Sequence, residues 1–162
     1  MCVFQFDENS SARSLIRDCR NAGVVEVRKY PSGDKGLPDE DMLDKYVQRD
    51  GVIVTFDAGL VQDHLDHVPD DHPGVIIVRH SPAISYPMTA ASAKNILDHF
   101  KAEFSDWHRV SWKNSVVTMT EASIEVGHVA SDHVVNDLSK SYNESEWQAE
   151  LRDCLSRIAS GS

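Results

Sequence analysis

Three aspartates stand where their carboxylates could share a cation. Asp7 and Asp57 each follow a short apolar segment directly, and Asp39 follows Pro38 at the expected start of a helix. In parallel α/β sheets, ligands bind outside the carboxyl ends of the strands, where helix N-termini also point. Carboxylates that converge there repel one another unless a cation offsets their charge, and Mg²⁺ or Mn²⁺ prefers such oxygen ligands. The sequence therefore predicts a divalent metal site formed by Asp7, Asp39 and Asp57.

Each of these aspartates also has a purely structural interpretation. Asp7 and Asp39 suit the first turn of a helix, where negative side chains are favoured, and Asp57 suits a turn. The metal-site interpretation depends on the joint placement of all three at the ends of separate elements. Thr55 lies two residues before Asp57, on the same face of the strand, so its hydroxyl could hydrogen-bond near the site or be an ordinary strand residue.

The elements that must position these residues alternate between strand and helix. Strands are expected over 3–6, 24–27, 52–56 and 75–78, and helices over 9–23, 38–49 and 89–104. The strands are near-continuous apolar runs, which is typical of a parallel sheet covered on both faces. A hairpin follows over 116–128, and after a polar spacer Asn143 begins an amphipathic helix with Trp147 on its apolar side. The expected fold is α/β, with three layers, a mainly parallel central sheet flanked by helices, and a C-terminal hairpin and helix.

Composition limits the classes of protein. The 162 residues are 41% hydrophobic, which suits one globular domain. The longest apolar runs, of about five residues, are far below the roughly 20 that cross a bilayer, so we expect a soluble cytoplasmic protein without membrane contact. The three widely spaced cysteines suggest neither a disulfide framework nor a zinc ribbon. The formal net charge of −10 opposes unspecific binding to nucleic acid, so a polyanionic substrate would need local positive charge or a metal.

Four segments resemble, in order and spacing, the compact PIN-like proteins, which are relatives of the PIN-domain nucleases. The segments are FQFDEN at 4–9, LPDEDML at 37–43, GVIVTFD at 51–57 and PGVIIVR at 73–79. Many PIN-domain nucleases are the ribonuclease toxins of toxin–antitoxin pairs. The resemblance covers residues 3–80, extends to the hairpin near 128 and does not include the last helix. It implies a PIN-like domain over 1–130, followed by a linker and a C-terminal amphipathic helix over 131–162.

The resemblance also implies roles for individual acids. Asp7 matches the first PIN acid, Asp39 the acid that precedes a helix, and Asp57 the acid of the T-x-D strand end, so these three are the expected catalytic residues and metal ligands. Larger PIN domains carry a further Glu on an additional helix that is missing here, so Glu8 or Glu40 could replace it, or the site could be one ligand short. The implied activity is Mg²⁺- or Mn²⁺-dependent hydrolysis of RNA by a toxin with an antitoxin partner.

Three arginines could hold the RNA substrate. Arg13, Arg17 and Arg20 fall in one stripe of the first expected helix, and guanidinium groups bind phosphate well. The alternative is an ordinary solvated, charged helix face.

The segment 63–72 contains three histidines and four aspartates. The spacing of His64 and His67 suits one face of a helix and would allow a transition-metal site, but the spacing fixes no third ligand. Because no Lys or Arg lies between Asp50 and Val78, we interpret the segment as an acidic surface loop, which would suit a basic antitoxin segment.

A non-catalytic PIN-like binding module is the second hypothesis for function. In it the last helix, with Trp147, would form a docking surface for a protein partner or for a second copy in a homodimer. The net charge favours this hypothesis, and the strand-end acids favour the nuclease. A phosphoacceptor receiver domain ranks lower, because Arg79-His80 rather than a lysine follows the strand at 75–78.

Overall fold

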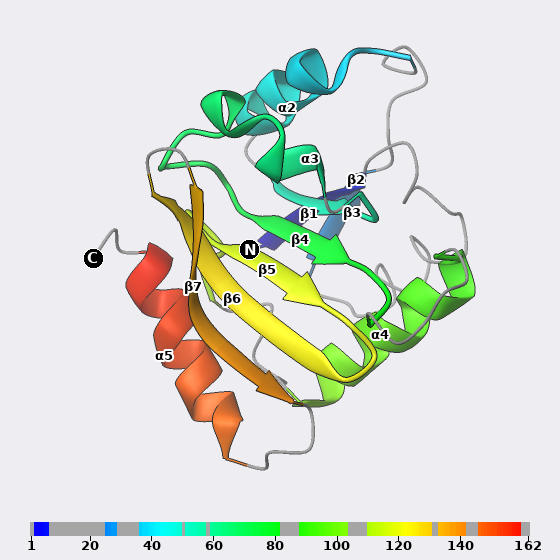
Figure 1. Cartoon of the computed structure of the whole chain (residues 1–162), viewed down its shortest axis with the longest axis vertical. Helices are drawn as coiled ribbons and strands as arrows, with labels where there is room; N and C mark the ends of the chain where they lie inside the picture. Colours follow the sequence, from blue (N-terminus) through cyan, green and yellow to red (C-terminus); the bar gives the residue numbers. More distant parts are fainter. Residues whose placement is uncertain are drawn as a thin grey trace.

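A computed structural model describes residues 2–6, 25–28, 36–49, 51–57, 59–81, 88–103, 110–130, 133–141 and 146–159 of the chain. Within these ranges the strands are β1 (Cys2–Phe6), β2 (Val25–Arg28), β3 (Val52–Thr55), β4 (Val75–Val78), β5 (Val116–Met119), β6 (Ser123–Ala130) and β7 (His133–Ser141). The helices are α2 (Asp39–Gln48), α3 (Gly59–Gln62), the short 3-10 helix η2 (Leu65–His67), α4 (Ala90–Glu103) and α5 (Trp147–Ala159). Figure 1 shows their arrangement.

The strands form one mixed sheet in the order β2-β1-β3-β4-β5-β6-β7. Every pairing from β2 to β5 is parallel, and β6 and β7 continue the sheet in antiparallel orientation. The expected α/β class, the parallel start of the sheet and the hairpin of β5 with β6 are therefore confirmed. The chain passes from β1 outward to β2 and later returns to the other side of β1 as β3, so the connections diverge between β1 and β3.

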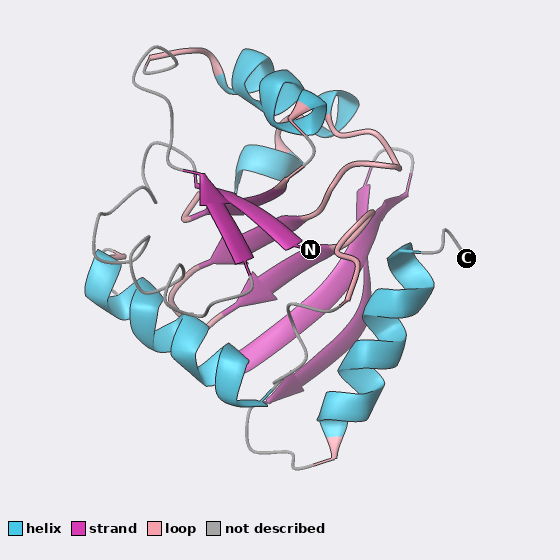
Figure 2. Cartoon of the chain, turned by 180° about the vertical axis from the view of Figure 1, so that it is seen from behind, coloured by secondary structure: helices cyan, strands magenta, loops and turns pink. Residues whose placement is uncertain are grey.

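Helices cover both faces of the sheet, which gives three layers. Alternate strand residues divide between two cores, because successive side chains point to opposite faces. Ile76 and Val78 pack with residues of α4 and α5, whereas Val75 and Ile77 pack with residues of α2 and α3. Figure 2, seen from behind, shows α4 and α5 on the face that they cover. No helix among the described residues is long and apolar enough to cross a membrane.

A buried glutamine joins the start of the sheet to the turn before β3. Gln5 of β1 is 1% exposed, and its Nε2 donates to the carbonyl oxygens of Tyr46 at 3.2 Å and Gly51 at 2.9 Å. A Cβ at Gly51 would lie 2.6 Å from the Gln5 side chain, so a residue without a side chain is required here. The Asp50-Gly51 turn signal in the sequence thus also reflects a close approach between β1 and the start of β3.

Strand β7 lies in the segment that we expected to be a polar spacer. Its residues, HVVNDLSKS, show no regular alternation, and the side chains with described burial are exposed or half-buried, as suits an edge strand. Its position comes from pairing with β6, where the register shifts between Val126 and Gly127. A Cβ at Gly127 would lie 2.2 Å from the carbonyl oxygen of Val135, so the close approach of β7 requires glycine.

The apolar side of α5 is not the docking surface that we expected. Its apolar side chains belong to the core with α4 and the sheet, and each is at most 4% exposed: Trp147, Leu151, Cys154, Leu155 and Ile158. The helix contacts β6 and β7 of its own chain. Because burial already removes these side chains from water, they have almost no exposed apolar area left for a partner or a second copy. The expected start at Asn143 and the expected helix over 9–23 lie outside the described residues.

Candidate functional site

Asp57 begins a tight turn at the carboxyl end of β3. Its backbone N–H donates to Oγ1 of the fully buried Thr55 at 3.0 Å, and its own Oδ1 accepts the N–H of Gly59 at 2.9 Å. Thr55 therefore helps to shape this turn. This matches the first of its two expected roles, in which its hydroxyl forms a hydrogen bond near Asp57. The carboxylate of Asp57 is nevertheless exposed, at the edge of the sheet where ligands bind in parallel α/β folds.

A second carboxylate converges on the same turn. A Cβ at Gly59 would lie 2.8 Å from Oδ2 of Asp63 and 3.4 Å from Oδ1 of Asp57, so both acids border the space above this glycine. Asp63 was not among the residues that we expected at the site. The sequence signal for it was its place in the acidic segment 63–72, which we interpreted only as surface.

Asp39 and Glu40, at the start of α2, lie beside His64. Oδ2 of Asp39 is 3.6 Å from Nε2 of His64, and Oε1 of Glu40 is 3.3 Å from its Nδ1. The structure thus brings two of the expected acids together around a histidine. Among the described residues, these two acids do not join Asp57 in a group close enough to hold a metal ion.

His67 meets the same helix further along. Its Nδ1 lies 3.1 Å from Oδ1 of Asp44, and this hydrogen bond, helped by Asp66 and Glu40, raises the pKa of His67 despite partial desolvation. His64 precedes η2 and His67 ends it, so the two do not share an α-helical face as their spacing suggested. Each instead pairs with acids of α2, which ties η2 to that helix.

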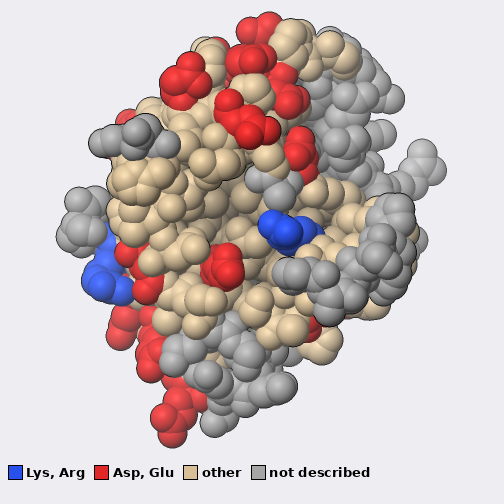
Figure 3. All heavy atoms as spheres, viewed as in Figure 1, with Lys and Arg blue, Asp and Glu red and all other residues tan. Residues whose placement is uncertain are grey.

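Acidic side chains gather at this end of the molecule. Figure 3 shows Asp and Glu gathered over α2 and the segment that follows α3. The described acids of these two segments are Asp39, Glu40, Asp41, Asp44, Asp63, Asp66, Asp70 and Asp71. The interpretation of 63–72 as an acidic loop agrees with this surface, except for His72, which is buried.

The donor chemistry of this edge fits a hard divalent cation, but the described donors are too few. Asp57 and Asp63 offer carboxylate oxygens of the kind that Mg²⁺ and Mn²⁺ prefer. Within the part of the chain that the structure describes, no three His, Cys, Asp or Glu residues are grouped closely enough to hold a metal ion. Phe6, the last residue of β1, pairs with Val54 of β3, and Asp7 and Glu8 follow Phe6 in the sequence but lie outside the described residues. Arg13, Arg17 and Arg20 also lie outside them.

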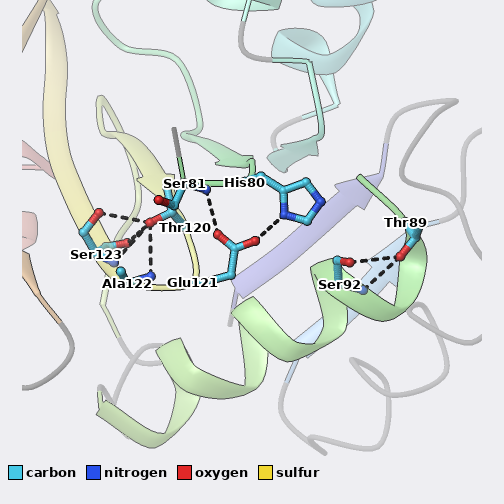
Figure 4. A network of polar contacts seen from close by, with 8 residues as sticks. All are labelled: His80, Ser81, Thr89, Ser92, Thr120, Glu121, Ala122 and Ser123. Carbon is cyan, nitrogen blue, oxygen red and sulfur yellow. Dashed lines mark hydrogen bonds and ion pairs between the residues drawn. The ribbon is translucent and has the colours of Figure 1, made fainter. Parts of the chain in front are cut away.

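A further polar pair at the same edge was missed from the sequence. Nδ1 of His80, which follows β4, hydrogen-bonds to Oε1 of Glu121, which follows β5, and Oε2 of Glu121 accepts the N–H of Ser81 at 2.7 Å (Figure 4). Burial raises the pKa of Glu121, but the bonds from His80 and Ser81 lower it, and the net result lies below the ordinary value. The sequence feature that could have indicated this pair is that both residues follow strands, as Asp57 does.

Hydroxyl groups fix the loops on either side of this pair. Oγ1 of Thr120 accepts the N–H groups of Ala122 at 3.3 Å and Ser123 at 3.1 Å, which closes the turn that carries Glu121. Oγ1 of Thr89 accepts the N–H of Ser92 at 3.2 Å and so caps α4, as its sequence position predicted. Figure 4 shows both sets together with the pair.

Comparison with known proteins gives no family, since no protein-family model, curated protein or solved structure matches this chain.

Proposed function

We propose that the chain is a metal-dependent endoribonuclease of PIN-like type, the toxin of a toxin–antitoxin pair. The observation that carries the proposal is the position of Asp57, an exposed carboxylate at the carboxyl end of β3. β3 lies beside β1, where the chain connections diverge, and open α/β sheets bind their ligands in the crevice at such a point. The resemblance of four segments to PIN-like proteins gives the chemistry expected there.

The proposed cation, Mg²⁺ or Mn²⁺, would be held by Asp57 and Asp7, with Asp39, Glu8 and Glu40 as the further candidate ligands. When bound, it would polarise a phosphoryl oxygen and lower the pKa of a bound water. The chain's own task is to hold these oxygens at the edge of the sheet, and the bonds of Asp57 to Thr55 and Gly59 support this because they fix the turn. The net charge of −10 agrees with a need for a cation when the substrate is RNA.

Cleavage of RNA by an Asp57 variant tests the proposal. Asp57→Asn keeps an oxygen that can accept the N–H of Gly59 but removes the negative charge, so the turn should survive while cation binding weakens. Labelled single-stranded and structured RNA are incubated with the wild-type protein and the variant, with Mn²⁺ or with a chelator. We expect Mn²⁺-dependent cleavage by the wild type and a loss of at least about 100-fold in the variant, since metal ligands contribute several kcal/mol to such barriers.

A matched control separates this effect from a general loss of negative charge. Asp137 of β7 bonds to His128 at 2.8 Å, away from the strand ends of the parallel sheet. Asp137→Asn should therefore cleave RNA like the wild type. Wild-type protein that leaves RNA intact with either metal contradicts the proposal.

The acidic surface over α2 and the segment after α3 favours a second candidate, a non-catalytic module that binds a basic protein segment. Such binding would be electrostatic and would weaken steeply with salt. Titration with a lysine- and arginine-rich peptide tests it, with Asp41→Lys and Asp44→Lys as variants of exposed α2 acids. Unchanged peptide binding in these variants would exclude this surface as the binding site for a basic segment.

A further inference from the structure

His80 and Glu121 form a pair that the proposed cation site does not use. Residues 41 positions apart meet because β4 and β5 are neighbours with Val78 paired to Met119. One oxygen of Glu121 bonds to the ring of His80 and the other accepts the N–H of the next residue, Ser81. Both oxygens of the carboxylate are held, so the carboxylate has one orientation and fixes the plane of the ring.

This arrangement also fixes which ring nitrogen carries the proton. The ionised carboxylate of Glu121 can only accept hydrogen bonds, so Nδ1 of the neutral His80 ring donates. The lone pair of the neutral ring is then on Nε2, which is the nitrogen that can take a proton from another group. The side chain of His80 is 8% exposed and that of Glu121 is 30% exposed, and this partial removal from water strengthens the bond between them.

The pair lies where a substrate is expected. His80 and Glu121 follow β4 and β5 at the carboxyl edge of the sheet, and Asp57 follows the adjacent strand β3 at the same edge. Val78 packs in the core with α4 and α5, so the His80–Glu121 pair lies on the α4 side of the carboxyl edge of the sheet. Asp57 and Asp63 lie at the start and just past the end of α3, whose buried residues belong to the other core. A substrate at this edge would have the acids on one side and the His80–Glu121 pair on the other.

We propose that His80 transfers the proton of the attacking water in RNA hydrolysis and that Glu121 is its positioning residue, an inference that rests on the proposed function. As the water oxygen forms its bond to phosphorus, Nε2 of His80 accepts one proton from that water. The bond from phosphorus to the leaving ribose oxygen breaks, and this oxygen takes a proton from solvent. The imidazolium then returns its proton to solvent, which restores the neutral ring.

A second histidine–carboxylate pair supplies the matched control. His128 of β6 and Asp137 of β7 bond at 2.8 Å within the antiparallel part of the sheet. His128 is not at the end of its strand, and its partner lies on the neighbouring strand, where the register between β6 and β7 shifts. The two pairs have the same chemistry, and only the His80 pair lies at the carboxyl edge of the parallel strands.

The test compares the rate of Mn²⁺-dependent RNA cleavage across pH in His80→Asn, Glu121→Gln and His128→Asn. We expect His80→Asn to lower kcat by about 10²- to 10⁴-fold and to remove one limb of the pH–rate profile. Glu121→Gln should lower kcat less and move that limb to lower pH, because a neutral amide no longer favours the charged ring. His128→Asn should match the wild type in rate and profile.

Two results separate this inference from the proposed function. If the wild type cleaves RNA and His80→Asn has the same rate and pH profile, the inference is overturned and the nuclease proposal stands. If the wild type does not cleave RNA, both are overturned. Nitrogen-detected NMR of the ring gives a readout that does not depend on a folded variant. It should show the proton of the neutral His80 ring on Nδ1, and a proton on Nε2 instead would overturn the proposed role of Glu121.

Discussion

Strand β4 carries a histidine near each end, and the two are held in opposite ways. At the amino end, His72 is 1% exposed, its Nδ1 accepts the N–H of Gly74 at 3.1 Å, and its Nε2 has no hydrogen-bond partner among the described residues. At the carboxyl end, His80 bonds to the carboxylate of Glu121, which Ser81 also holds. Burial fixes the first ring, and a charged partner fixes the second.

This difference separates a structural histidine from one suited to exchange protons. Burial lowers the pKa of His72 to about 4, although Asp71 and Asp70 nearby act in the opposite direction. A proton on its Nδ1 would also abolish the bond from Gly74, because two donors would then face each other. His72 therefore stays neutral in the folded protein at pH 7, whereas His80 has an ionised partner that stabilises its charged form.

The largest effect that would test this comparison is a loss of stability in acid. The ring of His72 takes up a proton near pH 6.5 in the unfolded chain but near pH 4 in the folded one, so the unfolded chain binds more protons between these values. The contribution of the neutral His72 ring to the free energy of unfolding is complete above pH 6.5. It is lost as the pH falls toward 4, and the loss is on the order of 3 kcal/mol. Urea unfolding at pH 7 and at pH 4 measures this loss.

His72→Gln is the control, because a Gln side chain does not titrate. It should lose less stability than the wild type over the same pH interval. Equal losses in the two proteins would show that burial of this ring does not control acid sensitivity.

A smaller effect sharpens the comparison at the carboxyl edge. Glu121→Ala removes a carboxylate that joins two strand ends, which should cost about 1.5–3 kcal/mol, the range for hydrogen bonds to charged groups. Asp57→Ala removes an exposed bond within one turn and should cost less than about 1 kcal/mol. Urea unfolding of both variants at pH 7 gives the two values, and a larger cost for Asp57 would reverse this order.

Local patterns in the sequence predicted the elements that depend on local chemistry. The apolar run at 75–78 matches β4, and Thr89 caps α4 as expected. The position of Asp57 after a strand also followed from the sequence, since it needs only the end of β3 and the turn to Gly59.

Features that depend on pairing between distant segments were not predicted. β7 has no alternation of its own and is a strand because β6 binds it. The His80–Glu121 pair exists only because β4 and β5 lie side by side. His72 stands in an acidic segment that suggests exposure, yet the turn into β4 buries it, with its carbonyl oxygen accepting the N–H of Asn114 at 2.8 Å. Such features follow from the order of the strands, which short motifs do not encode.

Thermal unfolding with and without Mn²⁺ tests the central claim, that the carboxyl edge of the sheet binds a divalent cation through Asp57. A cation that binds only the folded wild-type protein should raise its stability by about 2.7 kcal/mol at a hundredfold excess over the dissociation constant. Asp57→Asn should be at least as stable as the wild type in chelator, because it relieves repulsion between acids, and should gain little from Mn²⁺. Equal Mn²⁺-induced shifts of Tm in the two proteins would contradict the metal site and, with it, the proposed nuclease.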